Sequence, residues 1–171
     1  MRITGGTLRG RTVPGKPRPA TRPTASRVRE ALFSIVGQDL SGVTVLDAYG
    51  GTGLLSFEAA SRGADLAWIL EKDGAAVRQI RQAAETLGLA DRVVVRRGSA
   101  PKDLPPGRYG LILLDPPYAL DPTEVLRAVT PLATDLVILE HASSREAPIV
   151  EGLEGKTRRY GDTALTVYRV V

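Results

Sequence analysis

Residues 43–53 read VTVLDAYGGTG, a short β-branched and aliphatic run that meets an acid and then a loop with three glycines. The next residues, LLSFEAASRG at 54–63, predict a helix that ends at Gly63. A buried strand that leads through a glycine-rich turn into a helix is the unit from which doubly wound α/β sheets are built. We therefore predict that residues 43–63 form one strand–turn–helix unit of such a sheet.

The rest of the chain repeats this alternation of strands and helices. Four further runs of aliphatic and β-branched residues predict strands: 66–73, 92–100, 110–118 and 135–141. Amphipathic segments predict helices: 24–37, 74–88 and 122–133. The tail at 155–171 looks like a closing antiparallel pair of strands. Nearly continuous apolar strands that are separated by helices indicate a parallel sheet that is buried on both faces.

The N-terminal part of the chain has a different character. Residues 1–13 alternate loosely about a Gly-Gly pair and predict a small β-hairpin, and four prolines within residues 14–23 predict an extended connector. Eight Lys or Arg and no acid fall within residues 1–29, which leaves 15 basic and 19 acidic side chains for the rest. We predict a division into residues 1–23 and a main domain at 24–171. The basic arm favours a polyanionic partner, and a solvated surface segment is the alternative.

Composition excludes several classes of site. The chain has no cysteine and a single histidine among 171 residues, with a net charge of +4. Disulfides, thiolate nucleophiles, cysteine-ligated zinc and multi-histidine metal sites are therefore excluded. No apolar run approaches the ~20 residues that span a bilayer, and the N-terminus lacks the apolar core of a signal peptide. We expect a cytoplasmic monomer with no metal and no membrane partner.

Ligands of parallel α/β sheets bind beyond the carboxyl ends of the strands. The residues predicted at those ends are mostly acidic: Asp47, Glu71, Ser99, Asp115 and Glu140. We therefore predict a binding edge that is lined with carboxylates.

The glycine loop matches neither of two common phosphate-binding patterns. A G-x-G-x-x-G fingerprint would need glycine where Ser56 stands, and no Gly-Lys-Ser/Thr follows. Asp47 lies directly before the loop, where it would repel a pyrophosphate. The loop therefore favours a ligand that carries positive charge.

S-adenosylmethionine is such a ligand, because it carries a sulfonium and an ammonium group. Glu71 follows Asp47 by 24 residues, and a carboxylate there can accept hydrogen bonds from both ribose hydroxyls of an adenosine. Either acid alone would be interpreted more simply as a turn or helix-dipole residue. The two together, each at the end of a predicted parallel strand, favour an adenosyl cofactor.

The fourth predicted strand ends in Asp115-Pro116-Pro117-Tyr118, which in its simplest interpretation is a turn. The combination also fits methyl transfer to an exocyclic amine of a nucleobase. A carboxylate and a backbone carbonyl can accept the two N–H bonds of the amine, and Pro116 has no N–H that would compete. Tyr118 offers a flat face on which an extruded base can stack. The amine would then be held in line with the methyl group, and positioning supplies much of the rate.

These segments resemble a known family. DPPY resembles the [DNS]-P-P-[YFW] motif of methyltransferases that act on exocyclic amino groups of bases. The chain as a whole resembles the RsmD family of bacterial 16S ribosomal RNA guanine-N2 methyltransferases. Six segments carry this resemblance in order: MRITGGTLRGR, TRPTASRVREALFSIV, LDAYGGTGLLSFEAASRGA, EKD, DPPY and YGDTALTVYRV.

The resemblance implies a fold and a set of site residues. The fold would be the seven-stranded, Rossmann-like class I S-adenosylmethionine-dependent methyltransferase sheet, with an antiparallel last strand and the small N-terminal β-hairpin. The catalytic residues would be Asp115, Pro116 and Tyr118. The cofactor-binding residues would be Asp47, Tyr49, Gly51, Gly53, Glu71, Ser99 and Thr24, with TRPT (21–24) covering the cofactor. The RNA-binding residues would be Arg2, Arg9, Arg11, Arg18 and Arg22.

The chain departs from the family pattern at two positions. Ser99 stands where the family commonly has an Asp that contacts the adenine amino group, and it can still accept one hydrogen bond. Tyr49 replaces a more usual Phe and is also aromatic. His141 is assigned no role.

The function implied is methyl transfer from S-adenosylmethionine to the N2 amine of a guanine in small-subunit ribosomal RNA, either free or in a partly assembled 30S subunit. The residues themselves do not separate guanine N2 from adenine N6 in RNA or DNA, so an adenine-N6 methyltransferase stays open. A non-catalytic RNA-binding protein of the same fold is a further alternative.

Overall fold

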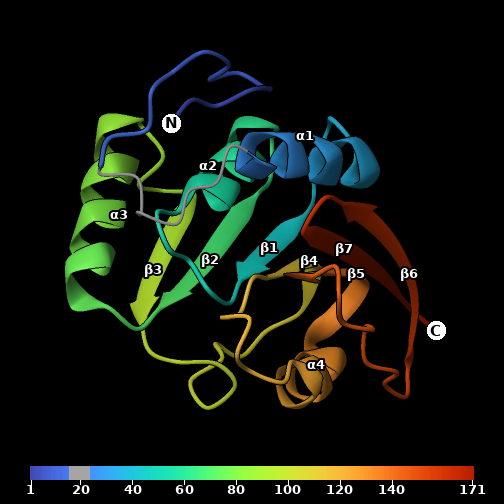
Figure 1. Ribbon diagram of the computed structural model, residues 1–171. Coiled ribbons are helices and arrows are strands. Elements are labelled where there is room, and N and C mark those ends of the chain that lie inside the picture. The colour runs from blue at the N-terminus through green and yellow to red at the C-terminus, as the bar shows by residue number, and fades with distance from the viewer. Residues whose placement is uncertain (16–23) are drawn as a thin grey trace.

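The computed structural model of the chain describes residues 1–15 and 24–171 (Figure 1). Within these residues, seven strands form one sheet in the order β3-β2-β1-β4-β5-β7-β6. The strands are β1 (Thr44–Asp47), β2 (Leu66–Glu71), β3 (Val93–Arg97), β4 (Tyr109–Leu114), β5 (Ala133–Ala142), β6 (Leu153–Tyr160) and β7 (Thr163–Val170). The helices are α1 (Thr24–Val36), α2 (Leu54–Ser61), α3 (Gly74–Thr86) and α4 (Thr123–Val129), with a 3-10 turn η1 (Thr130–Leu132). No helix in the described ranges is both long and apolar enough to cross a membrane.

The strand pairing confirms the predicted sheet. Strands β3, β2, β1, β4 and β5 are parallel neighbours, and β7 pairs antiparallel with both β5 and β6. The last strand therefore runs against the others, between β5 and the edge strand β6. This arrangement brings the carboxyl ends of β1, β2 and β4 to one edge of the sheet.

Several boundaries differ from the sequence-based expectation, two of them for clear structural reasons. The fifth strand continues to Ala142, which pairs with Thr163, so Glu140 lies within β5 and not at its end. The predicted helix at 122–133 is α-helical only to Val129 and then tightens into η1, which contains Pro131. Proline has no N–H and cannot continue an α-helical hydrogen-bond pattern.

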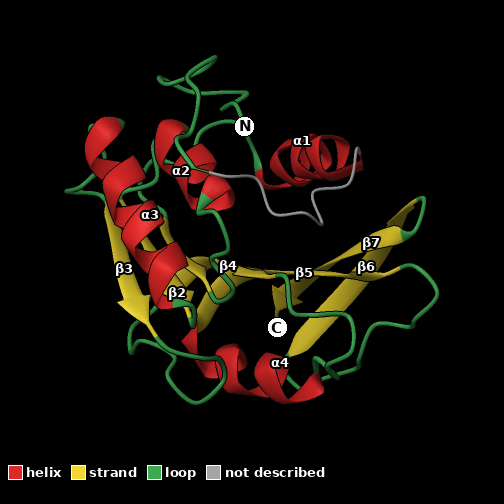
Figure 2. Cartoon of the chain, turned by 60° about the vertical axis from the view of Figure 1, so that its left-hand side comes forward, coloured by secondary structure: helices red, strands yellow, loops and turns green. Residues whose placement is uncertain are grey.

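Helices cover both faces of the sheet, as the continuous apolar strands predicted. Figure 2 shows α1, α2 and α3 on one side and α4 on the other. Successive residues of one strand pack into the two hydrophobic cores on opposite faces of the sheet. Val45 packs into the core beneath α1–α3, and Leu46 packs into the core above α4. Leu113 and Leu114 of β4 divide in the same way.

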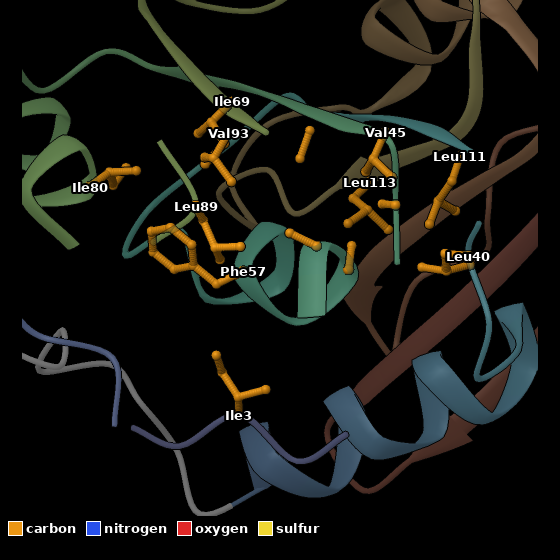
Figure 3. Close-up of a cluster of buried hydrophobic side chains, with 14 of the residues drawn as sticks. Ile3, Leu40, Val45, Phe57, Ile69, Ile80, Leu89, Val93, Leu111 and Leu113 are labelled. Atoms are coloured by element: carbon orange, nitrogen blue, oxygen red, sulfur yellow. The ribbon is translucent and has the colours of Figure 1, made fainter. Parts of the chain in front are cut away.

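The N-terminal segment folds back on itself and packs against the main core. Arg2 and Thr12 form an antiparallel bridge, and the N–H of Ile3 donates to the carbonyl of Arg11 at 3.0 Å. Ile3 and Val13 are each 1% exposed, and Figure 3 shows Ile3 near Phe57 of α2. The predicted hairpin is thus present as a short pairing whose apolar side chains belong to the core of the main domain. The division of the chain at residue 23 stays a prediction, because residues 16–23 of the connector lie outside the described residues.

Candidate active site

The first acid of the site, Asp47, is the last residue of β1 and is 2% exposed. Its carboxylate accepts hydrogen bonds from the N–H of Tyr49 at 3.2 Å and from the hydroxyl of Ser56 at 3.2 Å. Burial raises the pKa of Asp47 to about 7; the two hydrogen bonds oppose this rise, and the nearby charges of Asp115 and Glu71 add to it. Because burial disfavours the ionised form of this carboxyl, a cationic group beside it would stabilise the carboxylate.

The glycine loop leads from this acid into α2 and is hydrogen-bonded to the end of β2. Gly51 has a φ of 61°, and its N–H donates to the carboxylate of Glu71 at 2.7 Å. Glu71 is 5% exposed, ends β2, and also accepts from the N–H of Asp73 at 3.0 Å. The loops after β1 and β2 are therefore joined through one carboxylate.

The second acidic loop begins directly after β4. Asp115 is exposed, whereas Pro116 is buried and Tyr118 is half-buried. The hydroxyl of Tyr118 lies 3.0 Å from the hydroxyl of Thr163, the first residue of β7. The loop after β4 is thus attached to the antiparallel strand β7 on the other side of β5.

One cleft, with a volume of about 650 Å³, brings most of the predicted site residues together. Its lining includes the following predicted residues: Asp47, Tyr49, Gly51, Glu71, Ser99, Asp115, Pro116 and Tyr118. The predicted cofactor-binding and catalytic residues therefore face a common space at the carboxyl edge of the sheet.

Other predicted residues lie elsewhere. Gly53 does not line the cleft; it precedes α2 with a φ of 80°, and a Cβ there would come within 2.9 Å of the Phe57 ring, which is a reason for glycine at this position. Thr24 begins α1, but its side chain lies outside the described part of the structure. Arg18 and Arg22, with most of the TRPT segment, also lie outside the described residues.

The predicted RNA-binding arginines of the hairpin are exposed: Arg2, Arg9 and Arg11. The turn of the hairpin contacts the C-terminal end of α2, because the N–H groups of Thr7 and Leu8 donate to Ser61. The cleft lies at the opposite end of α2, at Leu54 and Leu55. Since an eight-residue helix spans about 12 Å, the hairpin turn and the cleft are separated by the length of α2.

The structure also adds residues to the site that sequence reasoning did not assign. They include Arg29, Thr52, Lys72, Leu120 and Thr163. Glu140, which the sequence placed at the binding edge without a role, also lines the cleft. Thr163 enters through its contact with Tyr118, which lies 45 residues away in sequence, and no local pattern signals it.

These features fit S-adenosylmethionine. The volume of the cleft is in the range of sites for small molecules. Asp47 supplies a buried acid for a cationic group, and the Glu71 carboxylate, which accepts the N–H groups of Gly51 and Asp73, is of the type that accepts hydrogen bonds from ribose hydroxyls. Ser99 is exposed at the cleft, and its N–H is held by the carboxylate of Asp103 at 2.9 Å, so its hydroxyl is the group that can face an adenine.

Comparisons with known proteins show which proteins this chain resembles. A family model described as "Conserved hypothetical protein 95" matches residues 1–169. The chain is 29% identical over 184 residues to YlbH of Bacillus subtilis, described as a putative rRNA methyltransferase. The alignment covers 99% of this chain and 98% of that protein. It is 35% identical over 122 residues to the ribosomal RNA small subunit methyltransferase D of Escherichia coli. This alignment covers 69% of this chain and 60% of that protein.

Solved structures show the same architecture. The Escherichia coli protein yhhF superposes with a TM-score of 0.85 and 28% identity, over 99% of this chain and 97% of that chain. An RNA methyltransferase of Salinibacter ruber, determined in complex with S-adenosyl-L-homocysteine, superposes with a TM-score of 0.67 over 92% of this chain and 94% of that chain. At 16% identity, this second likeness concerns the fold alone.

Proposed function

We propose that this chain, which belongs to the RsmD family of methyltransferases, transfers a methyl group from S-adenosylmethionine to the N2 amine of a guanine in small-subunit ribosomal RNA. The observation that carries the proposal is the position of Asp115, Pro116 and Tyr118 on the cleft that Asp47 and Glu71 also line. A methyl donor and an amine acceptor must meet within one space, and this cleft offers groups suited to each.

The donor half of the cleft is formed by the loops after β1 and β2. S-adenosylmethionine supplies an electrophilic methyl group on a positively charged sulfur. Asp47 would attract the positively charged part of the ligand, and ionisation of its buried carboxyl would be favoured by that charge. Glu71 would accept hydrogen bonds from the ribose, in an orientation that its bonds from Gly51 and Asp73 already fix.

The acceptor half is formed by the loop after β4. The lone pair of an exocyclic amine is delocalised into the base, so the amine is a weak nucleophile. Asp115 and the carbonyl of Pro116 would accept its two N–H bonds, which favours a pyramidal nitrogen with its lone pair directed at the methyl group. Tyr118 would stack on the extruded base, with its ring held by the contact to Thr163. Most of the rate would come from holding the two reactants in line.

The RNA backbone would be held by exposed cations. Arg2, Arg9 and Arg11 are exposed on the hairpin, and Arg18 and Arg22 would extend this basic segment. Because base extrusion needs a locally unpaired nucleotide, either naked 16S RNA or a partly assembled 30S subunit could supply the target. Such a substrate would place the enzyme in the bacterial cytoplasm. We propose that it acts there as a monomer.

A transfer assay tests the proposal. S-adenosylmethionine with a labelled methyl group is titrated in the presence of unmethylated 16S RNA and, in parallel, of small subunits that lack the modification. Saturable transfer of label to either substrate is expected. A protein that binds the RNA but transfers no label to either substrate would instead be a non-catalytic RNA-binding protein of this fold.

A further inference from the structure

A buried arginine at the wall of the cleft is not used by the proposed chemistry. Arg29, in α1, is 9% exposed and lines the cleft. One terminal nitrogen donates to the carbonyl of Arg2 at 3.1 Å, and the buried Nε has no hydrogen-bond partner among the described residues. A guanidinium has five N–H donors. Arg29 therefore brings a positive charge with unused donor capacity to the cleft.

The nearest carboxylate does not neutralise this charge fully. Glu58 lies 3.8 Å from the Nε of Arg29, and its side chain is fully buried. The same carboxylate forms a closer ion pair with Arg62 at 2.9 Å and accepts the backbone N–H groups of Thr4 and Gly5 at 3.0 and 2.9 Å. One carboxylate is thus shared by two buried guanidiniums, so the cluster has one positive charge in excess. A buried charge that is only partly compensated is costly, and an anionic ligand group would complete the compensation.

The rest of the cleft restricts which anion can approach. Asp47, Glu71 and Asp115 line the same space, and they would repel a phosphate or another purely anionic ligand. An amino-acid group carries both charges: its ammonium can lie near the acids while its carboxylate reaches the arginine. Of the basic residues that line the cleft within the described ranges, Lys72 is exposed after β2, and Arg29 is the buried one.

We propose that Arg29 binds the carboxylate of the methionyl end of S-adenosylmethionine, which makes it a binding residue of the donor half. This assignment rests on the proposed function, because it takes S-adenosylmethionine as the ligand. Arg29 would then connect three parts of the molecule: the ligand, the N-terminal hairpin through the carbonyl of Arg2, and α2 through Glu58.

A ligand that lacks only the carboxylate tests this assignment. Decarboxylated S-adenosylmethionine keeps the sulfonium, the ammonium and the adenosine. Calorimetry on the wild-type protein should give a dissociation constant about 10- to 100-fold higher for this ligand than for S-adenosylmethionine, as expected for loss of a charge-assisted hydrogen bond. Arg29→Met should weaken S-adenosylmethionine binding by the same factor and leave the decarboxylated ligand nearly unaffected, so that the preference disappears.

Two further variants keep the test decisive. Arg29→Lys retains the charge but not the fork of donors, so it should keep part of the preference, and it serves as the folded comparison if Arg29→Met does not fold. Arg27→Met, on an exposed position of the same helix, should keep the full preference. Equal weakening of both ligands by the Arg29 variants would overturn the assignment and make Arg29 a structural residue. Failure of the wild-type protein to bind either ligand would overturn the proposed function itself.

Discussion

The two acidic loops at the carboxyl edge of the sheet differ in how exposed their side chains are. In the loop after β1, Asp47 is 2% exposed and accepts from Tyr49 and Ser56, and Gly51 is bonded to Glu71. In the loop after β4, Asp115 is exposed, and Leu120 is 53% exposed. The first loop is arranged before any ligand arrives, whereas the second presents side chains to solvent.

This difference corresponds to the two reactants. A small ligand that must be enclosed is suited by a buried, hydrogen-bonded loop. A base on a large RNA must enter from outside, and an exposed loop allows this approach. Substitutions in the first loop should therefore change ligand affinity and protein stability together, and substitutions in the second should change methyl transfer with little effect on stability.

The largest effect is expected from Asp115→Ala. The substitution removes the carboxylate that we assign to the acceptor amine, so kcat for methyl transfer should fall by about 100-fold or more, as when one aligned hydrogen-bonding group of a transition state is removed. Because Asp115 is exposed, the melting temperature and the affinity for S-adenosylmethionine should stay near wild-type values.

Asp121→Ala is the matched control for this experiment. Asp121 is an exposed acid of the same loop that accepts from Thr123 and does not line the cleft. This variant should keep its transfer rate. Unchanged transfer by a folded Asp115→Ala variant would show that Asp115 takes no part in the reaction, and would contradict the assignment of the loop after β4 to the amine.

Asp47→Asn should change stability and affinity in opposite directions. Burial raises the pKa of Asp47 from 3.8 to about 7, so the folded protein keeps this proton to higher pH than the unfolded chain. The resulting stability is fully present below about pH 3.8 and is lost as the pH rises through about 7. Denaturant unfolding of the ligand-free protein at pH 8 should show Asp47→Asn more stable than wild type by up to about 4 kcal/mol.

The same variant should bind S-adenosylmethionine about 10-fold more weakly at pH 8, because a charged contact is lost. At pH 5 the two proteins should differ less in stability. Asp91→Asn, on an exposed loop position, should match wild type in both measurements. A stability difference that does not grow with pH would contradict the assigned titration of Asp47.

Substitutions of Tyr118 separate its ring from its hydroxyl. Tyr118→Leu should lower kcat/KM for RNA by about 10-fold, because stacking of a base on an aromatic ring contributes roughly 1–3 kcal/mol. Tyr118→Phe keeps the ring and loses the hydroxyl with its contact to Thr163, so a decrease of about threefold is expected. Equal losses in the two variants, measured in steady-state assays, would show that the hydroxyl and not the stacking face matters.

The smallest effects are expected from the hairpin, which belongs to neither loop. Arg9→Ala or Arg11→Ala should weaken RNA binding a few-fold and lower the slope of log affinity against log salt by about 0.7–0.9 per substitution. Affinity for S-adenosylmethionine should not change. Point substitutions are preferred to deletion of residues 1–13, because Ile3 and Val13 are 1% exposed and belong to the core. An unchanged slope of log affinity against log salt would show that these arginines do not contact the RNA.

Much of this site follows from local sequence. Asp47, Glu71 and Asp115 each come at or directly after a strand of aliphatic residues, and parallel strands necessarily bring their carboxyl ends together. The alternation of Val45 and Leu46 between two cores explains why the strands read as continuous apolar runs.

The parts that local sequence does not reveal depend on contacts between distant segments. Glu58 looks like an ordinary helical acid, yet it is fully buried because Thr4 and Gly5, more than 50 residues away, cover it. The position of Arg29 at the cleft depends on the same packing. Gly53 shows the converse: a glycine that sequence pattern assigns to the ligand is explained by its positive φ and its closeness to Phe57.

Identification of the methylated nucleoside tests the central claim most directly. Unmethylated 16S RNA or small subunits are incubated with the protein and S-adenosylmethionine, digested to nucleosides, and analysed by mass spectrometry. The proposed function predicts N2-methylguanosine with the wild-type protein and none with Asp115→Ala. N6-methyladenosine as the product, or N2-methylguanosine at an unchanged level with Asp115→Ala, would contradict it.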